Sequence, residues 1–133
     1  MKIFDCFMFF DEDQVLDLRL NVLNEYVDYF VIVESIYNHR GEKRNLLFNS
    51  NKYKYFSDKI IYLIYDKIPN SIKEIEKKDS KITQDYKYIM NALYRENSQR
   101  NFILEGLKNA DENDIILISD VDEIPKLNIN ILK

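Results

Sequence analysis

Glycine, proline, cysteine and histidine are all scarce in this sequence. Its 133 residues include two glycines, two prolines, one cysteine and one histidine. One cysteine excludes a disulfide framework and a cysteine-rich zinc site, and one histidine excludes a metal site made of several histidines. The two glycines, Gly41 and Gly106, are too few and too far apart for the GxGxxG or Walker loops that hold phosphates on backbone amides. A nucleotide-binding chain of this composition must therefore hold phosphate in another way.

The chain also lacks an excess of positive charge and a long apolar run. Its 19 basic and 23 acidic side chains give a net charge of -4. A binder of duplex DNA needs a basic face, so we expect no nucleic acid partner. There is no stretch of about 18 apolar residues, and the residues after Met1 lack the apolar core and cleavage site of a signal peptide. We therefore expect no transmembrane segment and a cytoplasmic, reducing compartment, with Cys6 as a small buried residue.

The apolar pattern predicts a single α/β domain over residues 1–133. The composition is 46% hydrophobic and 32% charged, which suffices for one buried core. Nearly continuous runs of β-branched and aromatic residues predict strands that are covered on both faces, as in a parallel sheet. The four expected strands cover residues 2–10, 28–34, 59–66 and 114–119.

Helices are expected between these strands. Apolar residues at helical spacing predict helices over residues 11–26 and 91–110, with a shorter one around residues 51–56. Residues 66–88 are rich in lysine and acids and have weak periodicity. They favour a solvated loop or short helix, with a mobile lid as the alternative. The alternation predicts a Rossmann-like, mostly parallel sheet with right-handed crossovers and flanking helices.

Each predicted strand ends in an acidic residue. These residues are Asp11, Glu34, Asp66 and Asp120. One or two of them are explained as helix caps. Because ligands of open α/β sheets bind beyond the carboxyl ends of the strands, the four together predict a site for a cation or for hydroxyl groups at that edge.

The most informative strand end is the Asp-x-Asp pair after the last strand. Asp120 and Asp122 follow the apolar run 115–118 almost directly. Residues two apart in an extended segment face the same side, so both carboxylates can point into one site. Two hard oxygen donors suit Mg²⁺ or Mn²⁺, whose other ligands would be water and phosphate oxygens. An acidic turn is the simpler explanation, and a phosphatase of the haloacid dehalogenase type is a weaker one, since Ile124 stands where that motif has Thr or Val.

Basic residues are expected near this pair. Arg95 and Arg100, on the helix before the last strand, can neutralise a diphosphate beside the acidic site. The simpler alternative for Arg100 is an ion pair with Glu96, one helical turn away. The loop of residues 35–46 is expected to overhang the site. Its His39 is either a surface residue or a contact to a nucleotide or sugar.

Arg19 stands out in the first predicted helix. At about 100° per residue it falls inside the apolar arc, and a buried arginine must be paired. The candidate partners are Glu34, Asp5 and Asp28. A structural role is favoured over a functional one.

Several segments of the chain resemble glycosyltransferase family 17, which contains the enzymes that add bisecting N-acetylglucosamine to glycoproteins. These segments occur in the order of the family and cover residues 2–12, 19–20, 27–34, 95–97, 99–101 and 115–125. The first reads KIFDCFMFFDE and the last reads IILISDVDEIP. The resemblance therefore spans most of the chain, although residues 67–90 add nothing to it.

The resemblance implies a GT-A fold, a UDP-sugar donor, a glycan acceptor and inversion at the anomeric carbon. The donor would be UDP-N-acetylglucosamine. The resemblance assigns Asp122 as the direct ligand of Mn²⁺ or Mg²⁺, and Asp120 as a contact to the metal or the ribose. The metal would then carry the phosphates in place of a glycine loop. The expected donor-binding residues are Asp120, Arg95, Arg100, Asn101, Glu34 and Asp11.

Family members are roughly twice as long as this chain of 133 residues. The chain therefore resembles the N-terminal, donor-binding part of a GT-A domain that is incomplete at its C-terminal end. The base that would deprotonate the acceptor hydroxyl is expected beyond residue 133. A homodimer or a partner chain would supply the missing half. A non-catalytic sugar-nucleotide-binding or subunit-pairing module is the alternative to an enzyme, and a phosphatase-like hydrolase is the third hypothesis.

Overall fold

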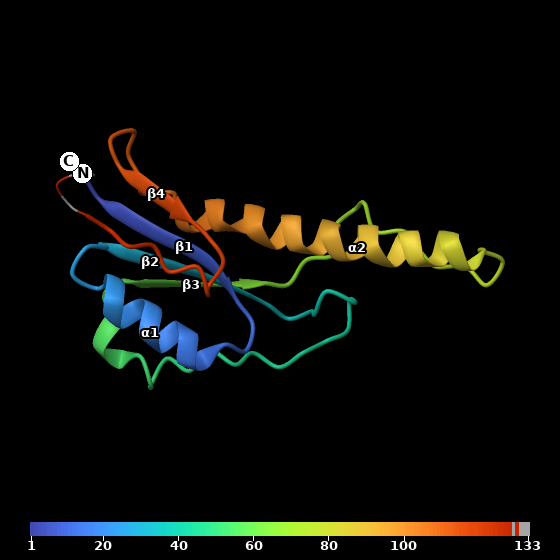
Figure 1. Cartoon of the computed structure of the whole chain (residues 1–133), viewed down its shortest axis with the longest axis horizontal. Helices are drawn as coiled ribbons and strands as arrows, with labels where there is room; N and C mark the ends of the chain where they lie inside the picture. Colours follow the sequence, from blue (N-terminus) through green and yellow to red (C-terminus); the bar gives the residue numbers. More distant parts are fainter. Residues whose placement is uncertain (129, 131–133) are drawn as a thin grey trace.

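A four-stranded parallel sheet forms the centre of the fold in the computed structural model, which describes residues 1–128 and 130. The strands are β1 (Ile3–Phe9), β2 (Tyr29–Ser35), β3 (Ile60–Tyr65) and β4 (Ile115–Ile118), in the spatial order β3-β2-β1-β4 (Figure 1). Each pairing is parallel. The predicted α/β class, the mostly parallel sheet and the four strands are therefore confirmed. The arrangement agrees with the Rossmann-like sheet of a GT-A domain.

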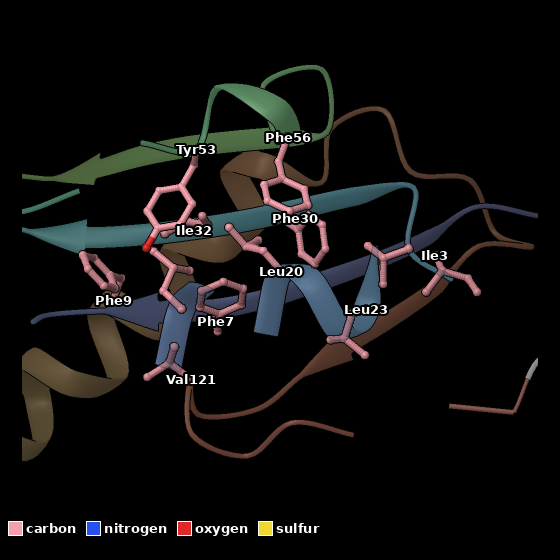
Figure 2. Close-up of a cluster of buried hydrophobic side chains, with 12 residues drawn as sticks. Ile3, Phe7, Phe9, Leu20, Leu23, Phe30, Ile32, Tyr53, Phe56 and Val121 are labelled. Carbon is pink, nitrogen blue, oxygen red and sulfur yellow. The ribbon is translucent and has the colours of Figure 1, made fainter. Parts of the chain in front are cut away.

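The central strands are buried on both faces of the sheet. All seven residues of β1 are buried. On one face, Phe7 packs with Leu20 of helix α1 (Asp13–Leu23) in the cluster that Figure 2 shows. On the other face, Phe4 packs with Ile103 of the 3-10 helix η2 (Phe102–Gly106). This double cover explains why β1 and β2 are apolar at nearly every position. The prediction of cover on both faces is wrong for β4, because this strand lies at the edge of the sheet and its Ile116 and Ile118 side chains are exposed.

Helix α2 is longer than the sequence indicates. It spans Lys81–Asn101 and continues into η2, so it begins at Lys81 instead of residue 91. The expectation of a loop, short helix or lid over residues 66–88 is therefore wrong for its last part. In Figure 1 the first half of α2 extends beyond the sheet. Because this half does not cover the core, its apolar side chains are exposed, as Ile82 and Ile89 are, and the sequence shows no amphipathic period there.

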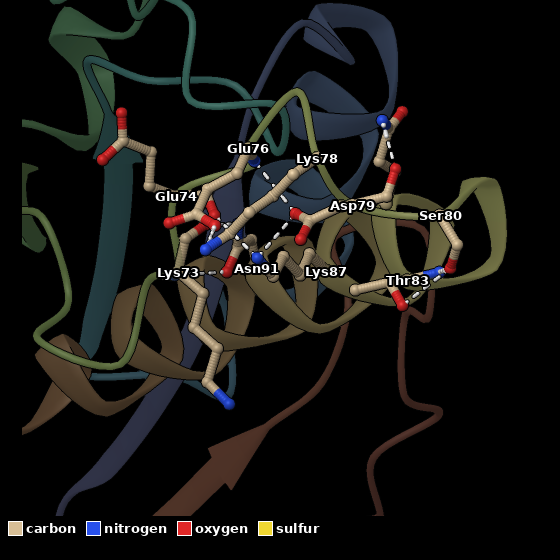
Figure 3. Close-up of polar contacts among 10 residues, drawn as sticks. Lys73, Glu74, Glu76, Lys78, Asp79, Ser80, Thr83, Lys87 and Asn91 are labelled. Atoms are coloured by element: carbon tan, nitrogen blue, oxygen red, sulfur yellow. Dashed lines mark hydrogen bonds and ion pairs between the residues drawn. The ribbon is translucent and has the colours of Figure 1, made fainter.

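Polar contacts hold this projecting half of α2 instead (Figure 3). Ser80 caps the helix, because its hydroxyl accepts a hydrogen bond from the Thr83 amide at 3.2 Å. The buried Asn91 side chain accepts from the Lys73 amide at 2.9 Å and donates to the Lys73 carbonyl at 2.8 Å. Lys87 pairs with Asp79 at 2.7 Å. Residues 73–79 thus lie beside the helix and provide hydrogen-bond and ion-pair partners for its polar side chains.

The connection from β2 to β3 is mostly irregular. The helix expected around residues 51–56 is only the 3-10 helix η1 (Lys54–Phe56). Tyr53 and Phe56 are buried beside α1 and cover the sheet in place of a longer helix (Figure 2). Among the described residues, no helix combines the length and the apolar character needed to cross a membrane.

Candidate functional site

An open cleft of about 280 Å³ lies at the carboxyl edge of the sheet, between the ends of β1 and β4. Strand β1, the turn after it, the loop after β2, helix α2 and the turn after β4 each contribute to its wall. The lining residues are Met8, Phe10, Glu12, His39, Glu96, Asp120, Val121 and Asp122. We call this the acidic cleft. Its position is the one at which open α/β sheets bind ligands.

Asp120 and Asp122 both line the acidic cleft, but their backbone is a tight turn and not the extended segment that the sequence indicates. The Glu123 amide donates to the Asp120 carbonyl at 2.9 Å, which closes a turn over residues 120–123. We call these residues the acidic turn. Val121 is buried in the core between the two exposed aspartates. The buried Val121 therefore anchors the turn that carries both carboxylates.

The two carboxylates differ in their contacts. Asp120 accepts a hydrogen bond from Arg100 at 3.3 Å, and its side chain is 57% exposed. Asp122 forms no hydrogen bond or ion pair with residues 1–128 or 130 that meets the usual distance limits. Asp122 is thus the freer oxygen donor of the pair.

The arginines of α2 make protein contacts of two kinds. Arg100 bridges Glu96 at 3.1 Å and Asp120 at 3.3 Å, so the expected pair with Glu96 forms and also reaches the acidic turn. Arg95 donates to the His39 carbonyl at 2.8 Å and packs under Gly41. Arg100 therefore lies beside the Asp-x-Asp pair, whereas Arg95 holds the loop of residues 35–46 through the His39 carbonyl.

The loop of residues 35–46 overhangs the carboxyl edge as expected. His39 lines the acidic cleft, and its ring contacts Phe10 edge to face with the ring centres 5.1 Å apart. His39 also lines an adjoining pocket beyond the ends of β2 and β3, together with Arg95 and the buried Gln99. The cleft and this pocket therefore form neighbouring hollows under one loop.

Glu34 does not enter the site, which corrects its assignment as a donor-binding residue. Its carboxylate is fully buried and accepts hydrogen bonds from the Leu47 amide at 2.7 Å, the Phe48 amide at 3.1 Å and the Tyr62 hydroxyl at 2.7 Å. It also pairs with Arg44 at 3.0 Å. Glu34 thus anchors the irregular connection between β2 and β3.

The other expected acids are also dispersed. Asp11 and Asp66 are exposed and lie outside the acidic cleft. Asn101, at the end of α2, lines a separate hollow with Tyr65 and Lys67. In residues 1–128 and 130, no three Asp, Glu, His or Cys side chains gather into a metal-binding group. The expectation that all four strand ends build one cation site is therefore wrong, and of the four expected acids only Asp120 lines the cleft, together with Asp122.

Sequence reasoning missed Glu12 as a residue of the cleft. It directly follows Asp11, and this adjacency at the end of the first strand was the available signal. Burial raises the pKa of the Glu12 carboxyl, and the charge of Asp11 adds to that rise, although hydrogen bonds from two backbone amides oppose it. The first strand therefore does deliver an acid to the cleft, one residue later than expected.

The fold and the cleft define an α/β domain with an Asp-x-Asp turn at the carboxyl edge of a parallel sheet. Over residues 1–133 the chain matches the sequence profile of Glycosyltransferase family 17, and it belongs to that family. This match leaves the phosphatase hypothesis without support. Beta-1,4-mannosyl-glycoprotein 4-beta-N-acetylglucosaminyltransferases of human and rat are each 30% identical to it over 118 residues. The mouse protein of the same name has the same identity over the same length.

The aligned region covers 86% of this chain but only 20% of each relative. The chain therefore spans about a fifth of the length of the curated relatives it matches, and not the half that the resemblance suggests. No solved structure matches the chain.

Proposed function

We propose that this domain binds the nucleotide-sugar donor of an N-acetylglucosaminyltransferase, UDP-N-acetylglucosamine, together with Mn²⁺ or Mg²⁺. The observation that carries the proposal is the Asp122 carboxylate, which lies beside Asp120 in the acidic cleft and has no partner among residues 1–128 and 130. Family membership and the names of the relatives support the transfer of N-acetylglucosamine to a glycan. Inversion at the anomeric carbon is part of the same proposal.

The residues of the acidic turn fit a hard divalent cation. Asp122 would bind the metal, and Asp120 would bind either the metal or the ribose. Carboxylate oxygens are preferred ligands of Mn²⁺ and Mg²⁺, which commonly complete their shell with water and substrate phosphates. The bound cation would supply Lewis-acid stabilisation of the charge that develops on the leaving UDP. Two protein carboxylates therefore suffice when the diphosphate brings further oxygens.

The surrounding side chains would bind and orient the donor. Arg100 lies 3.3 Å from Asp120 and can turn its guanidinium towards a phosphate once a cation neutralises that carboxylate. Phe10 and His39 form an aromatic wall of the same cleft. Arg95 would hold the loop that overhangs the donor. Together they replace the glycine loop that the sequence lacks.

The remainder of the reaction lies outside this donor site. An inverting transfer requires a base to deprotonate the acceptor hydroxyl. We place that base and the glycan acceptor site beyond residue 133, or on a second copy or partner chain. Under this proposal, residues 1–133 bind the donor but need the other part for transfer.

The test measures the melting temperature of the protein with MnCl₂ alone, with UDP alone and with both. Mn²⁺ plus UDP is expected to raise the melting temperature of the wild type, because a ligand that binds only the folded state stabilises it. The Asp122→Asn variant should lose this rise. Asp66→Asn is the matched control, since Asp66 is an exposed acid at the same edge but outside the cleft. Its rise should equal that of the wild type.

Two outcomes would overturn the proposal. The first is a wild type that shows no rise at millimolar Mn²⁺ and UDP. The second is an equal loss of the rise in Asp66→Asn and Asp122→Asn. Hydrolysis of UDP-N-acetylglucosamine, measured in parallel as released UDP, separates a domain that activates its donor from one that only binds it.

A further inference from the structure

Arg19 is the largest fully buried side chain of the structure within residues 1–128 and 130. It lies on α1 with no exposed surface. A buried guanidinium is costly unless its N–H groups are all hydrogen-bonded and its charge is paired. The contacts of Arg19 therefore show what the fold uses this residue for.

One side of the Arg19 guanidinium forms an ion pair with Asp5. Nε donates to Oδ2 at 2.8 Å and Nη2 donates to Oδ1 at 2.7 Å, so the pair is bidentate. Asp5, on β1, is also fully buried. Of the three partners that the sequence suggests, the structure selects this one, and the pair makes the buried group electrically neutral.

The other side of the guanidinium holds the acidic turn. Nη1 donates to the backbone carbonyls of Asp120 at 2.8 Å, Val121 at 3.2 Å and Glu123 at 3.0 Å. Nη2 donates to the Ser119 hydroxyl at 2.6 Å, and that hydroxyl donates to the Glu123 carbonyl at 3.1 Å. The backbone of the turn is therefore fastened from inside the core by a residue about a hundred positions earlier in the chain.

These contacts determine where the aspartate side chains point. With the carbonyls of residues 120, 121 and 123 bound to the buried guanidinium and Val121 in the core, Asp120 and Asp122 remain at the surface of the cleft. If Arg19 only filled the core, its pair with Asp5 would be sufficient, and no contact to the turn would be needed. Apolar residues can often replace such a buried ion pair without loss of stability. The three bonds to the turn are what an apolar replacement cannot reproduce.

We propose that Arg19 is the positioning residue of the Asp-x-Asp site: it holds the acidic turn in the conformation that binds a divalent cation and the diphosphate of the donor. This inference rests on the proposed function for its ligand and on the observed contacts for its mechanism. Arginine is required because its planar fork reaches Asp5 and the turn at the same time, whereas a lysine ammonium cannot span both.

The central variant is Arg19→Lys, which keeps the positive charge beside Asp5 but loses the planar guanidinium group that contacts both Asp5 and the turn. Loss of residues that orient metal ligands typically weakens metal binding by about 10- to 100-fold. We therefore expect the Kd for Mn²⁺ alone, measured by electron paramagnetic resonance, to rise by about that factor. Ser119→Ala removes one contact to Arg19 and the bond from the same hydroxyl to the Glu123 carbonyl, and we expect a smaller rise because both hydrogen bonds of the Arg19–Asp5 pair are kept.

The matched control is Lys59→Met. The Lys59 ammonium donates to the carbonyls of Asn24 at 2.6 Å and Val27 at 2.9 Å, before the start of β2 and therefore at the opposite edge of the sheet. This variant also removes a half-buried cation that holds backbone carbonyls. We expect it to lower the melting temperature and to leave the Kd for Mn²⁺ unchanged.

A second readout needs no ligand. Amide hydrogen exchange at Asp120 and Glu123 reports the acidic turn itself, because both amides are bonded within it. Exchange at these amides should be at least tenfold faster in Arg19→Lys than in Lys59→Met under conditions where both proteins are folded. If the wild type binds no Mn²⁺ but the turn amides still exchange faster in Arg19→Lys than in Lys59→Met, the proposed function is refuted. The role of Arg19 in holding the turn would then still stand.

The positioning role fails if folded Arg19→Lys keeps both the wild-type Kd for Mn²⁺ and the slow exchange at the turn. If Arg19→Lys does not fold, Ser119→Ala decides the question. An unchanged Kd and unchanged exchange in that variant would then overturn the proposal.

Discussion

Replacement of Glu34 by glutamine is expected to destabilise the fold by about 3–5 kcal/mol, the usual cost of removing one partner of a buried ion pair. The carboxylate of Glu34 accepts three hydrogen bonds, from two backbone amides and the Tyr62 hydroxyl, and is also paired with the Arg44 guanidinium. A glutamine side chain offers one acceptor oxygen, and its NH₂ group would face donors. Arg44, whose side chain is 15% exposed, would then lack its counter-charge.

The hydroxyl of Tyr62 makes the loss more severe. Burial raises the pKa of Tyr62, and the bond to Glu34 raises it further, so the phenol stays protonated and must donate. Unsatisfied buried donors cost about 1–3 kcal/mol each, which is consistent with the total expected for Glu34→Gln. For a domain of this size the change corresponds to a drop in melting temperature of roughly 10–20 °C.

The assay is urea unfolding followed by circular dichroism, with the free energy of unfolding taken from the midpoint and slope. Glu42→Gln is the matched control, because Glu42 is exposed and its carboxylate receives a long contact of 3.4 Å from the Asn38 side chain and no other bond from the described residues. Its effect should stay within about 0.5 kcal/mol. Glu34→Gln should keep the rise in melting temperature with Mn²⁺ and UDP. A variant of unchanged stability that no longer binds UDP would refute this reasoning and return Glu34 to the donor site.

Two further predictions concern the loop above the site and the edge far from it. Gly41 has a φ of 83°, and a Cβ at this position would lie 2.5 Å from the Arg95 guanidinium. Gly41→Ala should therefore lower the free energy of unfolding, measured in urea, by about 1–3 kcal/mol. An unchanged urea midpoint would show that the loop adapts freely. Hydrogen bonds from the Asp111 and Lys2 amides, with the nearby Lys2 charge, lower the pKa of Asp114 from its ordinary value of 3.8. A lowered pKa stabilises the fold above that value and the contribution is lost as pH falls below it, so Asp114→Asn should lose less stability than the wild type between about pH 4 and pH 2. Parallel losses in the two proteins would contradict this assignment.

The strands and the Asp-x-Asp pair are local features, and both could be predicted from the sequence. The apolar run of residues 115–118 predicts a strand, although Ile116 and Ile118 of this edge strand are exposed, and the aspartates that follow the run come to the carboxyl edge with it. The start of α2 could not be predicted in this way. Its first half is held by polar contacts such as Asn91 with Lys73, which leave no apolar period in the sequence.

The choice among similar acids was made by the tertiary structure. Glu34 is the last residue of one predicted strand and Glu12 comes just after another, but the connection between β2 and β3 folds over Glu34 and encloses it, whereas Glu12 lines the cleft. The sequence likewise shows that Arg19 must be buried and paired, and it leaves three acids as partners. Only the assembled sheet brings Asp5 and the acidic turn to the two sides of one guanidinium, because these contacts join residues that the chain itself keeps far apart.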